Sequence, residues 1–532
     1  MQSNKRREVH TVSCLLVIDY TQVNRLSAHD VIIIGAGLGG LTCGAKLAKE
    51  GKKILLIEQQ DKVGGCAVVF HRKENMTFEA SLHEIDGLDE QDAKLGILSD
   101  LTVLDHVEFV RVHEFYRFLK GDLDVVVPNR VPDAIEALTM AFPSETKAIQ
   151  IYFHDLMELR RQVTRTQWPR WKKILAGPIY LLLIRKLITF QKMTVGEYLD
   201  RLSANDLLKI TICANIGYYH DDPYSLSMLN FGLGQISYYH GGYYIKGGSQ
   251  TLSDYLAKII TDNGGEIMLN HLVTEIVTED GKAIGIRYIQ KHRKDAEEQL
   301  ALGNIIVANA AIPNIVNHLI PSLQHTRYRA NINTMKRSLS LFTIYFSFKD
   351  SISSYLDNRY STIVYDKSVE TLRDIYKIEQ TNDHKKKGFV IVDYAAIDSG
   401  INSDSSYNGV ICGVDYLENW EHLDESAYKN KKNEIIKIYT ERLERKFPGI
   451  TQHLTYVEMA TPKTIQRYTL NPNGSVYGFA PTPNQAGSSR IRHKDAQIDN
   501  LYYASVWTFP GGGFTGAIIS GYLCAIEVLR AK

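Results

Sequence analysis

The chain has 532 residues, of which 44% are hydrophobic and 23% charged, and its formal net charge is +1. A chain of this length is too long for one compact core, so we expect two domains interleaved in sequence. The composition excludes a disordered chain. The near-zero charge gives no reason to expect nucleic-acid binding. Six cysteines without a CxxC pair are typical of a reducing compartment and predict neither a disulfide framework nor a metal site.

Residues 1–28 begin with a basic patch and contain the apolar run VSCLLVI. Asp19 cuts this run short and no small-residue cleavage site follows, so we expect a flexible N-terminal extension rather than a signal peptide. No apolar run in the chain is long enough to predict a bilayer-spanning helix. We therefore expect a cytoplasmic protein.

The most informative pattern is a strand followed directly by a glycine turn. The β-branched run Val31 to Ile34 leads without a spacer into Gly35-Ala36-Gly37-Leu38-Gly39-Gly40 and then a helix. In such a turn the first glycine permits the tight bend, the second lets the backbone approach a pyrophosphate, and the last lets the helix pack on the strand. The free N–H groups and the dipole of the helix favour a bound anion. The pattern predicts a dinucleotide site.

A second apolar run, Ile54 to Ile57, ends in Glu58. A ribose-binding acid is expected at this distance from the glycine turn. The Glu58 carboxylate would accept hydrogen bonds from ribose hydroxyls and would repel a 2′-phosphate. Gly64 and Gly65 follow closely. Paired glycines allow a second close approach to an extended cofactor, although an ordinary loop would have the same pattern.

Two later stretches have the pattern of the same domain. Residues 241–249 are a glycine-rich turn before an expected helix at 251–263, and strands are expected at 266–269, 272–277, 285–289 and 305–308. Near the C-terminus an expected strand at 501–504 precedes Pro510-Gly511-Gly512-Gly513-Phe514-Thr515-Gly516 and an expected helix at 517–529. This second glycine-to-helix junction would bring more backbone donors to the same ligand.

These patterns divide the chain into interleaved domains. Residues 1–28 are the extension; 29–94, 238–320 and 471–532 form the nucleotide-binding domain; and 95–237 and 321–470 form the substrate domain. The first substrate block is mainly helical, with a membrane-facing part described below. The second contains runs at 341–348, 389–394 and 410–414 that predict an antiparallel sheet with one buried face. The basic run at 384–388 is expected to be a solvated loop.

With glycine-rich segments at both ends, the chain resembles the phytoene desaturase, carotenoid isomerase and retinol saturase group of FAD-dependent oxidoreductases. Besides the N-terminal turn, the matching motifs are GGYYIKGGSQTL at 241–252, RYTLNPNGSVYG at 467–478 and NLYYASVWTFPGGGFTGAIISG at 500–521. The resemblance covers almost the whole chain. It implies an α/β fold with a discontinuous, Rossmann-like, glutathione-reductase-like FAD-binding domain and an interleaved α+β substrate domain.

The resemblance also implies an FAD site and an activity. FAD would be held by Gly35, Ala36, Gly37, Gly39, Gly40, Glu58, Gly64 and Gly65, with Val273 near the adenine and Gly512, Gly513, Phe514, Thr515 and Gly516 near the flavin. The enzyme would desaturate, saturate or isomerise an apolar isoprenoid polyene. The chain departs from the group at Ile245, often a proline, and at Ser81-Leu82-His83, where a glycine often precedes the histidine. The second departure argues against transferring fine active-site geometry.

Adding or removing hydrogen across an unactivated carbon–carbon bond requires a proton donor or acceptor beside the flavin. His83 and Glu84 are the titratable residues nearest in sequence to the flavin fold, so we expect them to be the acid/base groups. The alternative is that His83 only hydrogen-bonds the cofactor or its loop. Gly232-Leu233-Gly234 lacks a preceding strand and a third glycine, so no second, stable NAD(P) site is predicted.

Aromatic residues are dense before the second glycine turn. They are Tyr218, Tyr219, Tyr224, Phe231, Tyr238, Tyr239, Tyr243 and Tyr244. Such side chains could line a channel for an elongated apolar substrate, or they could belong to the core.

Residues 159–196 hold nine Lys or Arg residues and no acid. Trp168, Trp171 and Tyr180 accompany an apolar run at 174–184. The run is too short to cross a bilayer, but a basic, tryptophan-edged segment can lie in the interface. It predicts peripheral membrane attachment through 160–192 and entry of a hydrophobic small-molecule substrate from the lipid; the alternative is a buried helix with a solvated basic face.

Two other functions fit parts of the pattern. A flavin-dependent amine oxidase has a similar cofactor domain and would favour a tight aromatic cage. A non-catalytic carrier of prenylated proteins, of the Rab-escort type, has the same nucleotide fold and need not keep FAD. The residues favour no direction of reaction and no oligomeric state.

Overall fold

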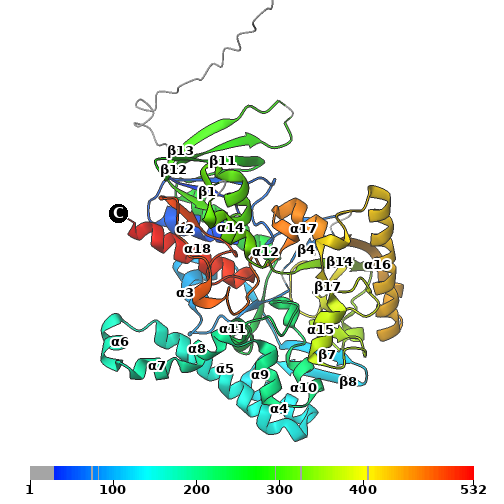
Figure 1. Ribbon diagram of the computed structural model, residues 1–532. Coiled ribbons are helices and arrows are strands. Elements are labelled where there is room, and N and C mark those ends of the chain that lie inside the picture. Colours follow the sequence, from blue (N-terminus) through cyan, green and yellow to red (C-terminus); the bar gives the residue numbers. More distant parts are fainter. Residues whose placement is uncertain are drawn as a thin grey trace, which may run out of the picture.

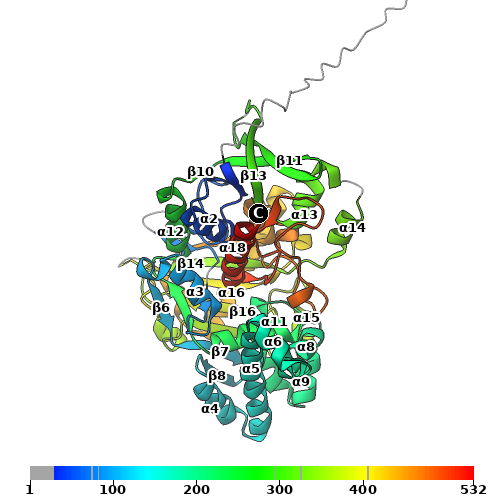
Figure 2. The ribbon, with the colours of Figure 1, turned by 90° about the vertical axis from the view of Figure 1, so that its left-hand side faces the viewer.

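The structure is a computed structural model. It describes residues 29–72, 76–81, 83–293, 295–323, 326–403 and 406–531, so the extension expected at 1–28 lies outside the described residues, as does Leu82. In Figures 1 and 2 one sheet lies in the upper part of the molecule, a second sheet lies lower, and a group of helices lies at the bottom.

The first sheet joins strands from three distant parts of the chain. Its parallel strands run in the order β10 (Glu266–Met268), β2 (Ile54–Ile57), β1 (His29–Ile34), β13 (Gln299–Ala308) and β19 (Leu501–Tyr503). β11 (His271–Glu279) and β12 (Lys282–Gln290) extend it as an antiparallel hairpin from β13. β2 is buried along its whole length. A parallel strand that is covered on both faces has an unbroken apolar sequence, as β2 does.

Three helices cover one face of this sheet. α2 (Leu38–Lys49) packs against both α12 (Ser249–Asp262) and α18 (Gly513–Arg530), and the last two labels lie beside α2 in both views (Figures 1 and 2). A Cβ added at Gly521 would lie 2.2 Å from the carbonyl oxygen of Gly39. The two glycines therefore let the start of α2 cross α18 closely.

The second sheet has the order β18 (Leu454–Ala460), β14 (Ser340–Phe348), β17 (Tyr407–Asp415), β16 (Phe389–Asp393), β15 (Ser361–Tyr365), β7 (Glu114–Lys120) and β8 (Leu123–Pro128). All neighbouring pairs are antiparallel except β15 and β7. Phe342 and Ile344 pack in one core cluster with Tyr439 and Leu443 of α16 (Glu425–Lys446). Side chains alternate along a strand, so the opposite face is free to line a cavity.

Helices and short strands complete the structure. They are α3 (Ala93–Asp100), α4 (Val131–Ala141), α5 (Thr146–Thr166), α6 (Arg170–Ala176), α7 (Ile179–Leu183), α8 (Arg185–Lys192), α9 (Val195–Leu202), α10 (Asp206–Ile212), α11 (Met228–Tyr238), α13 (Ile312–Asn314), α14 (Arg327–Thr334), α15 (Leu372–Glu379) and α17 (Pro462–Thr469), with β3 (Val69–His71) paired to β4 (Thr77–Glu79), and β5 (Ile85–Asp86) and β6 (Phe109–Val112) paired to β9 (Gly242–Ile245). The predicted α/β class is confirmed; the exact domain boundaries stay a prediction.

The prediction of a solvated loop at 384–388 is wrong for three of its residues, Gly388 among them. His384 and Lys387 are buried, whereas Lys385 and Lys386 are exposed. The Lys387 ammonium donates to the carbonyl oxygens of Glu379, at 2.9 Å, and Val414, at 3.1 Å. Backbone carbonyls thus replace water around this cation, a partner set that a run of lysines cannot indicate.

One helix within the described part of the chain, α18, is long and apolar enough to cross a bilayer by length and composition, with 44% of its apolar window buried. The expectation of no such run missed it. Its buried residues include Gly516, Ser520, Gly521 and Cys524, and the helix packs against α2 in the core.

Lys94 is the basis of a stability prediction. Its side chain is fully buried, with the ammonium 2.6 Å from a carboxylate oxygen of Asp92 and 4.0 Å from one of Asp86. We expect Lys94→Met to cost about 3–5 kcal/mol in the free energy of unfolding, because it leaves carboxylates buried without their cation. Urea denaturation should show a much smaller loss, about 0–1 kcal/mol, for Lys258→Met, which breaks an exposed pair with Asp262. Equal losses would contradict the prediction.

Candidate active site

A cavity of about 2700 Å³ lies between the two sheets. This is several times the roughly 300–1,000 Å³ of a typical small-ligand site. Its walls include the glycine turns before α2 and α18, the free face of the second sheet, and parts of α5, α8 and α11. The cavity therefore has room for a dinucleotide and a second long ligand.

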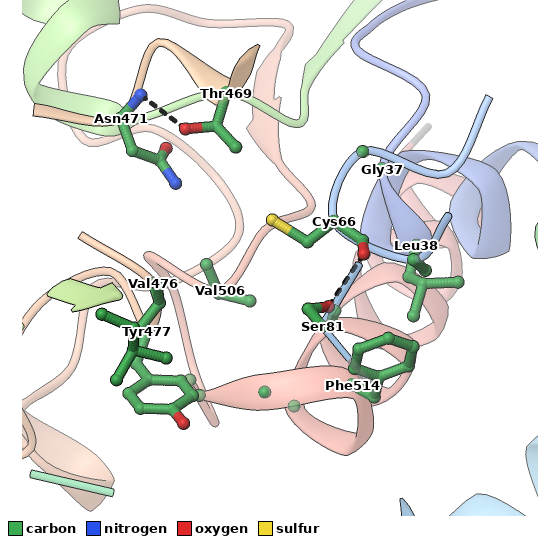
Figure 3. A pocket seen from close by; sticks show the side chains of 18 of the residues that line it. Gly37, Leu38, Cys66, Ser81, Thr469, Asn471, Val476, Tyr477, Val506 and Phe514 are labelled. Atoms are coloured by element: carbon green, nitrogen blue, oxygen red, sulfur yellow. Dashed lines mark hydrogen bonds between the residues drawn. The ribbon is translucent and has the colours of Figure 1, made fainter. Parts of the chain in front are cut away.

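Two helices begin at this cavity without the usual caps. Gly37 precedes α2 and Gly512 precedes α18; neither makes a side-chain capping bond, and neither helix has an acid in its first turn. Leu38 and Phe514, the neighbours of these junctions, face one space in Figure 3. Unpaired N–H groups at two helix starts attract negative or electron-rich groups. Glycine junctions from opposite ends of the chain thus converge.

Most predicted site residues line this cavity. They are Gly35, Gly37, Gly39, Glu58, Gly64, Gly65, His83, Glu84, Val273, Gly512, Gly513, Phe514, Thr515 and Gly516. Ala36 and Gly40 do not; they lie beneath the turn. The Ala36 N–H donates to Glu58, and a Cβ on Gly40 would lie 2.2 Å from the carbonyl oxygen of Gly35. These two residues therefore shape the turn from behind.

The glycine turn fits a ligand that approaches the backbone closely. A Cβ on Gly39 would lie 2.1 Å from the carbonyl oxygen of Ala504 at the end of β19. Gly65 has a φ of +64°, and a Cβ there would lie 3.1 Å from the Cα of Gly37. Side chains at these positions would displace the turn or fill the cradle, so the residues present suit a pyrophosphate.

Glu58 stands at the end of β2 with its carboxylate buried. One oxygen accepts the Ala36 N–H at 2.6 Å and the other accepts the Gln60 N–H at 2.9 Å. Burial raises the pKa of Glu58, and these backbone donors oppose the rise. A carboxylate has about four lone-pair sites, so the group can also accept a hydrogen bond from a ribose.

His83 and Glu84 come just before β5, on the cavity wall. Burial lowers the pKa of His83 to about 4, so its ring is neutral at pH 7. Burial, together with the charges of Glu114 and Asp86, raises the pKa of Glu84 well above its usual range. Neither oxygen of Glu84 has a hydrogen-bond partner among the described residues. Burial therefore favours the protonated, neutral form of Glu84, which lies in the cavity wall.

Asp86 is the contrasting carboxylate. Burial favours its neutral form, but Lys94 and hydrogen bonds from Ser237 and Thr515 lower its pKa overall. The hydroxyl of Thr515 donates to Asp86 and so ties β5 to the first turn of α18. Two carboxyl groups on one wall thus have opposite pKa shifts, an arrangement typical of sites that move protons.

Sequence reasoning missed several wall positions, among them Cys66, Val476 and Tyr477. Cys66 directly follows the second glycine pair, and its sulfur points into the cavity in Figure 3. Cys66 is exposed, and it lines this cavity. Val476 and Tyr477 belong to the motif at 467–478, and the Tyr477 hydroxyl donates to the carbonyl oxygen of Gly217 at 3.2 Å.

The aromatic residues before β9 divide between the two expected roles. Tyr218, Tyr219 and Tyr238 line the cavity. Phe231 and Tyr244 instead belong to the buried core. Three of these residues therefore line the cavity, and their role as a substrate channel stays a prediction.

Comparison with known proteins identifies the family. Residues 38–529 match the family described as flavin containing amine oxidoreductase. The all-trans-retinol 13,14-reductase of Danio rerio is 25% identical, with 94% of this chain and 86% of that protein covered. The phytoene desaturase (neurosporene-forming) of Rhodobacter capsulatus is 26% identical, with 93% of each covered. The chloroplastic prolycopene isomerase of Daucus carota is 23% identical, with 95% and 81% covered.

Solved structures support the fold. Putrescine oxidase bound to putrescine has a TM-score of 0.61 at 13% identity, covering 94% of this chain and 99% of that one. Cyclohexylamine oxidase from Brevibacterium oxydans has a TM-score of 0.60 at 14% identity, covering 94% and 98%. The chain thus belongs to the flavin-containing amine oxidoreductase family and is an FAD-dependent oxidoreductase. The predicted resemblance, fold class and cofactor are confirmed.

Proposed function

We propose that this enzyme changes the hydrogenation or the double-bond geometry of an apolar isoprenoid polyene. The observation that carries the proposal is one continuous cavity that joins two open helix starts to a long apolar wall. The sequence relatives named as a retinol reductase, a phytoene desaturase and a prolycopene isomerase support the same substrate class.

FAD would lie along the glycine junctions. We propose that the turn from Gly35 to Gly39, backed by Ala36 and Gly40, receives the pyrophosphate, with Gly64 and Gly65 beside it. Glu58 would accept hydrogen bonds from the ribose hydroxyls, and Val273 would lie near the adenine. The backbone from Gly512 to Gly516 would face the flavin. When bound, FAD supplies two-electron chemistry at carbon. The chain's own part is to orient the polyene, exclude water and move protons.

His83 and Glu84 are the proposed acid/base pair. A neutral carboxylic acid can donate a proton to a substrate carbon, and a neutral imidazole can accept one. Both residues line the cavity. They shortly precede Asp86, which accepts the hydrogen bond from Thr515. Their positions beside the start of α18 support a role at the reacting end of the substrate.

The length of the cavity favours a polyene over an amine. The similarity to putrescine and cyclohexylamine oxidases extends to the fold alone, since identity is 13–14%. A small amine needs a closed cage, whereas this cavity extends to the outer ends of α5 and α8, where Val163, Thr166 and Leu187 line it. Turnover of simple amines by the FAD-loaded enzyme, without turnover of polyenes, would reverse this choice.

The outer ends of α5 and α8 carry an exposed apolar tip, formed by α6 and α7. Trp171, Ile174, Leu175, Ile179, Leu181 and Leu182 are each 60–77% exposed. In Figure 1 these two helices project beyond α8, away from the sheets. Apolar side chains concentrated on a projecting tip are typical of a surface that enters another apolar phase.

The charges around this tip are fewer than the sequence suggests. Ion pairs join Arg160 to Asp89, Arg165 to Glu158 and Lys186 to Asp155. The acids lie outside 159–196, so the segment alone could not reveal them. The basic residues left on the tip still favour anionic lipid, by about 1 kcal/mol each near the surface. We propose peripheral attachment through 160–192, with substrate entry between α5 and α8.

We expect the combined Trp171→Ser, Leu175→Ser and Leu182→Ser variant to lose most of its binding to anionic liposomes. Burying each such side chain is worth about 1.5–3 kcal/mol, so the partition should fall by at least about a hundredfold. Sedimentation with anionic vesicles at low salt measures the fraction of protein that is bound. Met140→Ser is the matched control, because Met140 on α4 is also exposed, at 75%, but lies away from the tip. Equal pelleting of all three proteins would contradict the proposal.

The activity itself is tested without assuming a direction. FAD-loaded and chemically reduced enzyme, mixed anaerobically with a lipid extract and analysed by mass spectrometry and chromatography, should change a polyene by a gain or loss of hydrogen or by isomerisation. A protein that purifies colourless and changes no lipid in either redox state would instead favour the carrier function.

A further inference from the structure

The free face of the second sheet forms a wall of the cavity remote from the glycine turns. Cross-strand register aligns Thr343 of β14, Cys412 of β17, Val390 of β16 and Ile363 of β15 in one row, and all four line the cavity. Such a row offers an extended, mainly apolar surface along which a chain-like ligand can lie.

A buried carboxylate interrupts this apolar wall. Glu379, the last residue of α15, lines the cavity and is only 6% exposed. One of its oxygens, Oε1, accepts the N–H of Gly388 at 2.9 Å. The other, Oε2, has no hydrogen-bond partner in the part of the chain that the structure describes. A buried oxygen without a partner is costly, so it indicates a group supplied from outside the chain.

The surroundings of Glu379 do not supply that group. Lys387 directs its ammonium to the carbonyl oxygens of Glu379 and Val414, not to the free carboxylate oxygen. Tyr365 donates its hydroxyl to Ala214 at 3.0 Å. The hydroxyl of Tyr416 is used by Asp221. These neighbours are committed elsewhere, so none of them satisfies Oε2.

We infer that Glu379 is a specificity-determining residue that binds a terminal hydroxyl of the substrate, so the preferred polyene is an alcohol rather than a hydrocarbon. This inference rests on the proposed function. A hydroxyl both donates and accepts, so it pairs with this carboxyl group in either protonation state. A hydrocarbon end would leave Oε2 unpaired, and sites built for a hydroxyl discriminate strongly against analogues that lack one.

The test compares two ligands that differ only in this group: all-trans-retinol and its hydrocarbon analogue, in which hydrogen replaces the hydroxyl. Binding to the FAD-loaded enzyme is measured by partition from detergent micelles and chromatography of the bound fraction. We expect the alcohol to bind about ten to a hundred times more tightly than the hydrocarbon, the range for one hydrogen bond to a buried acid.

Variants locate the preference. Glu379→Leu should bring the two affinities within about twofold of each other, whereas Glu379→Gln, which keeps an acceptor oxygen, should retain part of the difference. Val390→Ala, on the same wall, should change both affinities but leave the ratio between them unchanged. Melting temperatures show whether the variants are folded. The comparison of the two ligands on the wild-type enzyme does not depend on the variants.

The outcomes separate this inference from the function on which it rests. Equal, tight binding of alcohol and hydrocarbon by the wild-type enzyme would overturn the role of Glu379 and leave the polyene function standing. A preference for the alcohol that persists in Glu379→Leu would also overturn that role. Binding of neither ligand would overturn both.

Discussion

Gly39→Ala should purify without its yellow colour. The added Cβ would lie 2.1 Å from the Ala504 carbonyl oxygen, and because that atom belongs to the backbone at the end of β19, α2 must move. Overpacking of this kind costs about 1–3 kcal/mol or more, and the displaced helix start no longer aligns its N–H groups with the cofactor. We expect FAD affinity to fall by about a hundredfold or more, as measured by absorbance after dialysis.

The matched control is Gly96→Ala. Gly96 lies within α3, and a Cβ there would meet no atom within 4 Å. Alanine favours a helix by about 1 kcal/mol over glycine, so this variant should be yellow and at least as stable as the native chain. Full FAD content in Gly39→Ala would mean that the turn before α2 is not where the cofactor is held.

Glu84→Gln should reduce turnover by about 10²- to 10⁴-fold, the usual contribution of one positioned acid or base, while FAD content stays unchanged. The amide keeps the size and burial of the side chain but has no acidic proton. Burial raises the pKa of Glu84, which favours the protonated form, and the proton is lost as the pH rises through that raised pKa. Native activity should therefore fall at high pH.

Measured kcat against pH distinguishes this role from a structural one. The alkaline fall should be absent in the residual activity of Glu84→Gln. In parallel, His83→Ala tests the second member of the pair, and its full turnover would remove His83 from the mechanism. If Glu84→Gln retains native kcat with native pH dependence, Glu84 only fills the wall.

The cofactor half of the fold could be read from local sequence because its constraints are local. A β-branched strand, a glycine turn and a helix are adjacent in the chain, so β1, α2 and β2 begin and end close to the predicted positions. The same holds at the C-terminus, although α18 begins at Gly513, earlier than predicted, because the glycines themselves form its first turn.

The remainder depends on partners distant in sequence. Lys387 looks like part of a solvated run until Val414 supplies its carbonyl. Arg160 and Lys186 look unpaired until the fold brings Asp89 and Asp155 to them. Glu379 has no motif at all; its importance comes only from an unpaired oxygen on a cavity wall. No periodicity or spacing could report these contacts.

A crystal structure of the yellow protein is the most direct test of the account. We predict one FAD per chain, with its pyrophosphate at the Gly37 end of α2, its ribose on Glu58 and its isoalloxazine beside the backbone of Gly512 to Gly516. A flavin ring that lies away from α18, or glycine junctions that contact two different molecules, would contradict this placement of the cofactor.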